Sequence, residues 1–291
     1  MLKTLTDKNK FVKTIAIASG KGGVGKSNIA ANLAVAMSKL GKKVMIVDAD
    51  LGLSNIHLLF NLAPKYSIQD LLSGDKTLKE VLVEGPYGIK LLPAGSGVQE
   101  LTRIDEFQRL KLLEAFDAYD DDIDVLIIDT AAGIAENVTF FCSAAQEIIV
   151  VTMPEPTAWL DAYHLIKVLN TEYQEKRFHV LVNSARCKKD ADETFLTLMT
   201  VSEKYMHISL DYLGYLPYDT HVQVAVRTRK AFSVLFPKIF LTQCVRDIAQ
   251  NLLNREEQVK GSLQFFIGNL LSTPVNTVQN KPLNAESVVE R

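Results

Sequence analysis

A glycine-rich loop between an apolar strand and a helix constrains this chain more than any other stretch. Residues 19–27 read Ser-Gly-Lys-Gly-Gly-Val-Gly-Lys-Ser and fit the pattern Gly-x-x-x-x-Gly-Lys-Ser. The apolar residues 14–18 precede the loop, and a helical pattern over 28–40 follows it. Glycines let backbone N–H groups line a concave anion site, and the helix N-terminus adds its positive dipole end. The stretch therefore predicts a phosphate-binding loop rather than an ordinary turn.

The residue types in this loop suggest how a nucleotide would be held. Lys26 would reach the β- and γ-phosphates, and the Ser27 hydroxyl would be a ligand of Mg²⁺. Lys21 is unusual, because a nucleotide site needs one loop lysine and this loop carries two. The residues expected to contact the nucleotide here are Gly20, Lys21, Gly22, Gly23, Val24, Gly25, Lys26, Ser27 and Asn28.

Strands and helices alternate along the chain and predict its fold class. The expected strands are 14–18, 44–47, 89–92, 124–129, 148–152, 178–183 and 213–216. The main expected helices are 28–40, 67–73, 100–119, 157–173, 191–205 and 238–254. Continuously apolar strands separated by helices are typical of a parallel sheet that is covered on both faces. We therefore predict a three-layer α/β fold with a mostly parallel sheet.

Three acids stand at the ends of expected strands, where ligands of such sheets bind. Asp48 and Asp50 are two residues apart and project to the same side if the extended geometry persists. One could hold a water on Mg²⁺ while the other polarises a water aimed at the γ-phosphate. Asp129 occupies the place of the usual second-shell Mg²⁺ contact and precedes the turn Thr130-Ala131-Ala132-Gly133. Each acid alone could instead be a helix cap or a loop anchor.

Two further strand ends could hold the base of a nucleotide. Asn183 ends one strand, and an amide that both donates and accepts suits an adenine edge. Pro217, Tyr218 and Asp219 end the last expected strand and could wall the base. Ordinary turns after the strands are the alternative.

Composition excludes several other classes of protein. The formal net charge of −2 argues against a surface that binds nucleic acid all over. The longest apolar runs are strand-sized, and the N-terminus lacks the apolar core of a signal peptide. The three cysteines and five histidines show neither disulfide nor metal-ligand spacing.

The chain is expected to hold one large domain and a C-terminal extension. We predict an N-terminal lead-in over 1–12, an ATPase domain over 13–255, a linker with an amphipathic helix over 256–271, and a disordered tail over 272–291. The helix has one apolar face, formed by Leu263, Phe266, Ile267, Leu270 and Leu271. Packing against a protein core is the alternative use of this stripe.

The two-lysine loop resembles the deviant Walker A motif of the MinD/ParA ATPases. Residues 47–55 and 129–133 are similar to the switch I and switch II segments of that superfamily. Within it, residues 51–55, 84–88 and 92–97 resemble the FlhG (FleN/YlxH) group of flagellar regulators more than MinD.

The resemblance implies a mechanism that depends on dimers. Such ATPases pair face to face when ATP is bound, and Lys21 would then cross to the partner's phosphates. A charge about 4 Å from a phosphate oxygen is worth roughly 4 kcal/mol at an effective dielectric near 20, which is about a thousandfold in rate. Asp50 would activate the water, while Asp48 and Asp129 would serve Mg²⁺ and its waters.

The resemblance also implies partners and a location. The expected protein is cytoplasmic, hydrolyses ATP to ADP, and binds the inner face of the cytoplasmic membrane reversibly through residues 262–271. Partners would be an FlhF-type GTPase and flagellar basal-body or regulatory proteins, although residues 1–12 lack the Asp-Gln-Ala box of many relatives. A MinD-type regulator of the division site is one alternative. A ParA-like DNA-partitioning protein is another, and DNA binding is not expected, because Arg227-Thr228-Arg229-Lys230 is the only compact basic cluster placed to support it.

Overall fold

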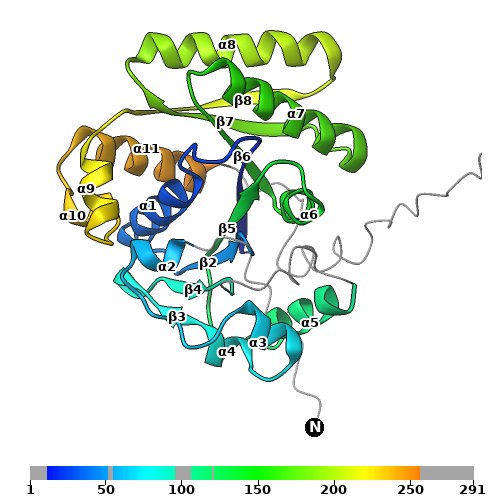
Figure 1. Cartoon of the computed structure of the whole chain (residues 1–291), viewed down its shortest axis with the longest axis vertical. Coiled ribbons are helices and arrows are strands. Elements are labelled where there is room, and N and C mark those ends of the chain that lie inside the picture. The colour runs from blue at the N-terminus through cyan, green and yellow to red at the C-terminus, as the bar shows by residue number, and fades with distance from the viewer. Residues whose placement is uncertain (1–11, 52–54, 96–105, 120, 256–291) are drawn as a thin grey trace, which may run out of the picture.

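The described residues, 12–51, 55–95, 106–119 and 121–255 of a computed structural model, contain one eight-stranded sheet (Figure 1). Its strand order is β3-β4-β2-β5-β1-β6-β7-β8, and only β3 runs antiparallel to its neighbour. The strands are β1 (Lys13–Ser19), β2 (Val44–Ala49), β3 (Val83–Glu84), β4 (Lys90–Leu92), β5 (Val125–Ala132), β6 (Glu147–Thr152), β7 (Arg177–Ala185) and β8 (Ser209–Pro217). The predicted mostly parallel sheet is confirmed.

Helices cover both faces of this sheet (Figure 1). They are α1 (Lys26–Lys39), α2 (Ile56–Leu59), α3 (Ile68–Ser73), α4 (Leu78–Val81), the 3₁₀ turn η1 (Pro86–Gly88), α5 (Glu106–Asp117), α6 (Glu136–Ala144), α7 (Pro156–Tyr173), α8 (Lys188–Tyr205), α9 (His221–Arg227), α10 (Phe232–Leu235) and α11 (Phe240–Asn254). None of these helices is both long enough and apolar enough to cross a bilayer.

Side chains that alternate along each strand divide the core into two sides. Ile15 and Ile17 of β1 pack with residues of α1, α10 and α11. Ala16 and Ala18 point to the opposite face and pack with residues of α6, α7 and α8. Because both faces of the sheet are covered, the central strands are apolar along most of their length, which is the pattern that the sequence shows.

The structure corrects several predicted boundaries. Helix α1 begins at Lys26 rather than Asn28, because Gly25 adopts a left-handed φ of 97° and turns the chain directly into the helix. Strand β8 begins at Ser209, four residues before the predicted start. It is an edge strand with a half-exposed face, so its polar residues hid the pattern of a buried strand. The predicted N-terminal lead-in, apart from Val12, and the predicted segments 256–271 and 272–291 lie outside the described residues.

A buried polar cluster fastens the end of α11 to the amino end of the sheet. The Lys13 ammonium donates to the carbonyl oxygen of Leu252 in the last turn of α11. The Arg255 guanidinium donates to His179 Nδ1 at 2.6 Å, so His179 carries its proton on Nε2 and donates to Glu147 at 2.5 Å. The point at which the chain leaves the described domain is therefore held by charged hydrogen bonds.

Candidate functional site

The carboxyl ends of β1, β2 and β5 meet at one edge of the sheet and bring the predicted residues together. Strand β1 lies between β5 and β6, and the loop that follows it leads into α1. In the register of the parallel pair β2 and β5, Asp48 lies beside Asp129. Residues that are 81 positions apart in the sequence thus share one site, at the kind of place where parallel sheets bind ligands.

Two glycines of the loop are required by the space around them. A Cβ at Gly20 would overlap the backbone carbonyl of Asp161 in α7, so the loop can pass this helix only without a side chain. A Cβ at Gly25 would collide with the Asn183 amide, and its φ of 97° is strained for other residues. These close approaches give the loop one shape.

Lys26 is the buried lysine of the loop. Only 8% of it is exposed, and its ammonium donates to the Ser19 hydroxyl at 2.8 Å. Burial lowers the pKa of Lys26, while the charges of Asp129 and Asp50 partly counter that effect. An ammonium placed in this way can supply positive charge to phosphate oxygens in a site that is poorly screened by water.

Asp129 is a buried carboxyl with an unusual titration. It is 1% exposed, and burial, followed by the nearby Asp48 charge, raises its pKa to about 8. A hydrogen bond between the Asp129 side chain and the Ser27 hydroxyl lowers this pKa. The lowering is smaller than the rise caused by burial. Its Oδ1 atom has no hydrogen-bond partner among the described residues.

These groups fit a Mg²⁺ ion with its waters. A buried carboxylate oxygen without a partner is costly, so it calls for a ligand that donates hydrogen bonds or positive charge. Mg²⁺ keeps several of its waters and takes few direct protein ligands, often beside substrate phosphates. We infer that Ser27 would bind the ion and that Asp129 and Asp48 would hold its waters.

Asp50 lies at the mouth of the buried acidic pair. It is half-buried, and its backbone N–H donates to Asp48 Oδ1 at 3.2 Å. Its charge acts on both Lys26 and Asp129, which places it in the same electrostatic site. The structure thus gathers all three predicted acids at the loop, with Asp50 the most accessible to water.

Lys21, the second lysine, lies outside this buried group. Its ammonium donates to Glu155 Oε2 and to Thr157 Oγ1, both at 2.9 Å. The Lys21 side chain is 37% exposed and that of Glu155 50%. An exposed pair of this kind stabilises a fold little, so the lysine can exchange partners at small cost.

Strand β5 continues past its predicted end at Asp129 to Ala132, and its last residues and the turn at Gly133 are hydrogen-bonded to β1, where the loop begins. The Gly133 N–H donates to the carbonyl of Ser19 at 2.9 Å, and Gly133 has a left-handed φ of 95°. The Thr130 hydroxyl donates to the carbonyl of Ile17 at 3.0 Å. A change in the loop on binding phosphate would therefore be felt directly by this turn.

The expected base-binding residues lie at the carboxyl ends of β7 and β8: Asn183 and Pro217 are still within the strands, and Asp219 follows β8. The Asn183 amide donates to the carbonyl of Val24 at 2.7 Å, so this side chain supports the phosphate loop. Asp219 Oδ1 accepts from the backbone N–H of His221 at 2.9 Å and lies 2.7 Å from its ring Nδ1. Partial burial alone would raise the pKa of Asp219, but the two contacts with His221 outweigh it, so the pKa is lowered. Pro217 pairs with Ala185 at the ends of the two strands.

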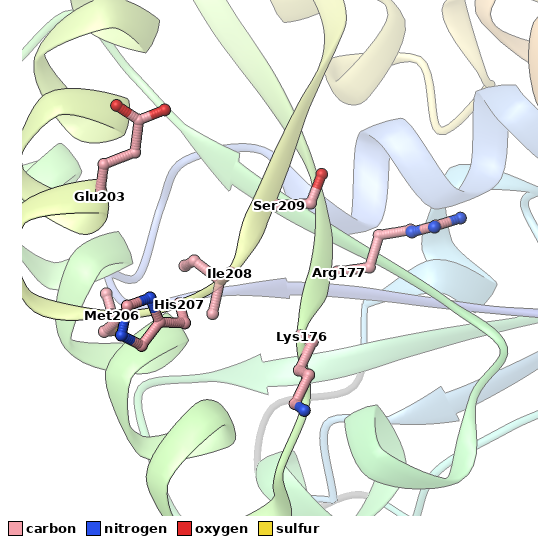
Figure 2. A pocket seen from close by; sticks show the side chains of 7 residues that line it. All are labelled: Lys176, Arg177, Glu203, Met206, His207, Ile208 and Ser209. Atoms are coloured by element: carbon pink, nitrogen blue, oxygen red, sulfur yellow. The ribbon is translucent and has the colours of Figure 1, made fainter.

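Among the residues that the structure describes, hollows lie at both ends of β7 and β8. The first is beside the loop, at the carboxyl ends of β6 to β8, and its lining includes Trp159, Arg186 and Tyr218. The second lies at the amino ends of β7 and β8, and its lining includes Lys176, Arg177, Glu203 and His207 (Figure 2). Only the first is close enough to the loop to extend the nucleotide site.

Sequence reasoning did not find several supporting residues. Ser19, which holds Lys26, and Glu155 and Thr157, which hold Lys21, carry no motif of their own. Glu155 and Thr157 follow the buried strand β6, so the rule that ligands bind at strand ends could have drawn attention to them.

Comparison with known proteins gives a consistent set of relatives. The family model described as "ParA: NUBPL iron-transfer P-loop NTPase" matches residues 10–253. Antiactivator FleN of Pseudomonas aeruginosa is 39% identical over 90% of this chain and 95% of its own. Flagellum site-determining protein YlxH of Helicobacter pylori is 33% identical over 88% of this chain and 86% of its own.

A solved structure supports the same fold. The MinC:MinD cell division protein complex of Aquifex aeolicus contains a chain that is 27% identical to this one, with a TM-score of 0.70. The match covers 86% of this chain and 100% of that chain.

The raised pKa of Asp129 gives a testable dependence of stability on pH. The pKa of Asp129 is about 8 in the folded state and about 3.8 in the unfolded state. Between pH 3.8 and pH 8, the folded protein therefore keeps a proton on Asp129 that the unfolded protein has released. Stability is therefore lost as pH rises toward 8. In EDTA without nucleotide, Asp129→Asn should lessen the fall in unfolding free energy between pH 5 and pH 8 by about 1–4 kcal/mol.

Urea titrations at the two pH values measure this difference. Asp122→Asn, which alters an acid with a 59% exposed side chain, is the matched control and should follow the wild-type dependence. Parallel curves for Asp129→Asn and the wild type would show that Asp129 is ionised throughout this range.

Proposed function

Because the chain belongs to the ParA family of P-loop NTPases, we propose that it is an ATP-driven switch that pairs on binding ATP and is reset by hydrolysis. The observation that carries the proposal is the phosphate loop with one buried and one exposed lysine. In each chain, Lys26 and the loop N–H groups would hold the phosphates of ATP or ADP. Ser27, Asp48 and Asp129 would hold Mg²⁺ and its waters, and Asp50 would activate the attacking water.

We propose that Lys21 acts in a homodimer across the interface. Within one chain, Lys26 already supplies the lysine that the phosphate loop needs. The ammonium of Lys21 is hydrogen-bonded to Glu155 and Thr157 and does not face that site. The phosphates of a second chain, brought to this face, would compete with that weak exposed pair. Hydrolysis would then depend on pairing, because the added charge is realised only when both chains are present.

The base of the nucleotide would lie between the ends of β7 and β8. Asn183 supports the loop from one side, and Pro217 and Asp219 would form the wall on the other. The hollow bordered by Trp159 and Tyr218 gives this side of the site an aromatic lining.

We further propose that the paired state binds a membrane from the cytoplasm. The stripe over residues 262–271 is apolar on one helical face and lies outside the described residues. One short helix of this kind would bind weakly, because isolated helices under about 12–15 residues are marginal. Two copies on a dimer would bind together and gain from effective concentration.

The process that this switch controls is proposed to be flagellar number and placement. Support comes from the two flagellar relatives, which share 39% and 33% identity over most of the chain. An FlhF-type GTPase and basal-body or regulatory proteins would be the partners. The alternative is a regulator of the division site, which the likeness to a chain of the MinC:MinD cell division complex favours at the lower identity of 27%.

Lys21→Ala tests the switch directly. The variant should bind ATP about as well as the wild type, because Lys26 is unchanged. It should lose ATP-dependent dimerisation or its stimulated hydrolysis, by up to about a thousandfold for a charge about 4 Å from a phosphate oxygen. Nucleotide titration, light scattering and phosphate release measure the three properties.

Two further variants frame that result. Lys176→Ala removes an exposed lysine at the opposite end of the strands and should behave as the wild type. Lys26→Ala should lose nucleotide binding itself. If Lys21→Ala paired and hydrolysed ATP as the wild type does, the proposed action of Lys21 on the partner's phosphates would be wrong.

Sedimentation with vesicles tests the stripe. The full chain should pellet with vesicles in ATP and remain in solution in ADP. Phe266→Asp with Leu270→Asp should weaken binding at least about tenfold, since each buried apolar side chain contributes roughly 1.5–3 kcal/mol. Val275→Asp with Val278→Asp places the same charges in the tail and is the control. If both double variants bound vesicles equally well, the stripe would not be the membrane-binding segment.

Deletion of the gene in the source organism separates the two processes. The flagellar proposal predicts cells with altered flagellar number or position and normal division, counted by electron microscopy. Minicells with normal flagella would instead favour the division-site alternative.

A further inference from the structure

One flank of the molecule carries basic residues without acids. Residues 220–246 contain five lysines and arginines and no aspartate or glutamate. They form α9, α10 and the first half of α11, which lie beside α1 on one side of the sheet (Figure 1). We define the basic flank as Arg227, Arg229, Lys230 and Lys238, four of the exposed cations of this region, together with Lys39 of α1.

The basic flank is held together as one surface. The backbone N–H groups of Arg229 and Lys230 close a turn onto α9 at 3.0 Å each. The ring of His221 packs edge-on against Phe236 at 4.5 Å, which joins α9 to the segment that leads into α11. Lys39 donates to the carbonyl of Ser233 in α10 at 3.1 Å.

The four cations of residues 220–246 in this flank have no salt bridge within the described part of the chain. Asp219, the acid that precedes the region, is occupied by His221. Glu84, on the neighbouring β3, is paired with Lys90 at 2.6 Å. Asp247 lies beyond the region on α11 and is an exposed acid. The flank thus keeps its positive charge available to a partner.

Exposed apolar side chains are interleaved with these cations. Val224 and Val226 of α9 are 45% and 44% exposed, and Phe240 at the start of α11 is 59% exposed. Tyr87 is 54% exposed and lies under the Lys39 ammonium, 4.9 Å from ring centre to nitrogen. Single exposed apolar residues are ordinary, but here they share a surface with cations of one sign.

The combination distinguishes among anionic partners. A protein partner usually offers both signs of charge and is met by a mixed surface, whereas a lipid surface or a nucleic acid offers negative charge alone. Nucleic-acid phosphates gain little from exposed valine and phenylalanine. An anionic bilayer is stabilised against such a surface by both kinds of side chain. The cations attract its headgroups, and the apolar side chains enter its interface.

We propose that the basic flank is a lipid-binding surface that contacts anionic headgroups directly. The inference rests on the proposed membrane association and adds a contact within the folded domain to the C-terminal stripe. That stripe has Lys260 as its one nearby cation, so it gains little from anionic lipid. The flank supplies the missing charge, and makes binding selective for anionic membranes.

The test compares two triple variants of the full chain in ATP. Arg227→Gln, Arg229→Gln and Lys230→Gln remove three charges from the flank. Their effect is measured by sedimentation with vesicles containing 30 mol% phosphatidylglycerol in phosphatidylcholine. Each basic residue near an anionic surface contributes about fivefold in affinity, so the loss should be on the order of a hundredfold. Raising the salt to 0.5 M should weaken the wild type toward the variant.

The control removes the same number of charges elsewhere. Lys176→Gln, Arg177→Gln and Lys204→Gln alter exposed residues near the hollow of Figure 2, around the end of α8. This triple variant should bind vesicles as the wild type does. A thermal melt of each variant checks folding, and substitution of exposed residues should leave it unchanged.

The remaining outcomes separate the flank from the stripe. Vesicle binding by the flank variant at wild-type affinity would overturn it, whereas loss of binding by the stripe variant alone would leave the membrane switch intact. Loss by the flank variant alone would reject the stripe and keep the flank. A wild type that ignores these vesicles overturns both. Binding to random-sequence duplex DNA in preference to vesicles, abolished in the flank variant, would make this a nucleic-acid surface.

Discussion

The balance of buried charge beside the phosphate loop is the constraint on which the site depends. Asp129 and Asp48 are both 1% exposed and lie side by side because β2 and β5 are paired in parallel. Two carboxylates so close cannot both ionise at low cost, and Lys26 offsets only part of the repulsion. The folded domain therefore keeps a proton on Asp129 below about pH 8, and a bound Mg²⁺ ion would favour the release of that proton.

The two lysines of one loop differ because their surroundings differ. Lys26 opens α1 and is enclosed by Ser19 and the acids, so its position is determined by the fold. Lys21 stands on the outer side of the loop and is held by an exposed carboxylate and a hydroxyl. A buried group suits the permanent task of binding phosphate. An exposed group with exchangeable partners suits a task that begins only when a second chain arrives.

The sequence could predict the sheet, the loop and the three acids because each rests on a short local pattern. Apolar strands followed by glycine or aspartate mark the strand ends wherever the sheet is parallel. The contacts of Lys21 with Glu155 and of Asn183 with Val24 could not be predicted, because they join residues 134 and 159 positions apart. Helices α9 and α10 were missed because segments of seven and four residues are too short to show a clear apolar period.

Helix α1 connects the phosphate loop to the basic flank through a rigid path. It begins at Lys26, and its Asn32 accepts a hydrogen bond from the Ser233 N–H of α10 at 2.8 Å, with both residues buried. The orientation of the flank relative to the loop is thereby set within one packed unit. In the proposed dimer, in which two chains pair through their loops, the two flanks would be presented in one fixed arrangement. Two fixed copies bind one surface far more tightly than either copy alone, provided that both can reach it. ATP-dependent pairing would then strengthen membrane binding without any conformational change within the domain.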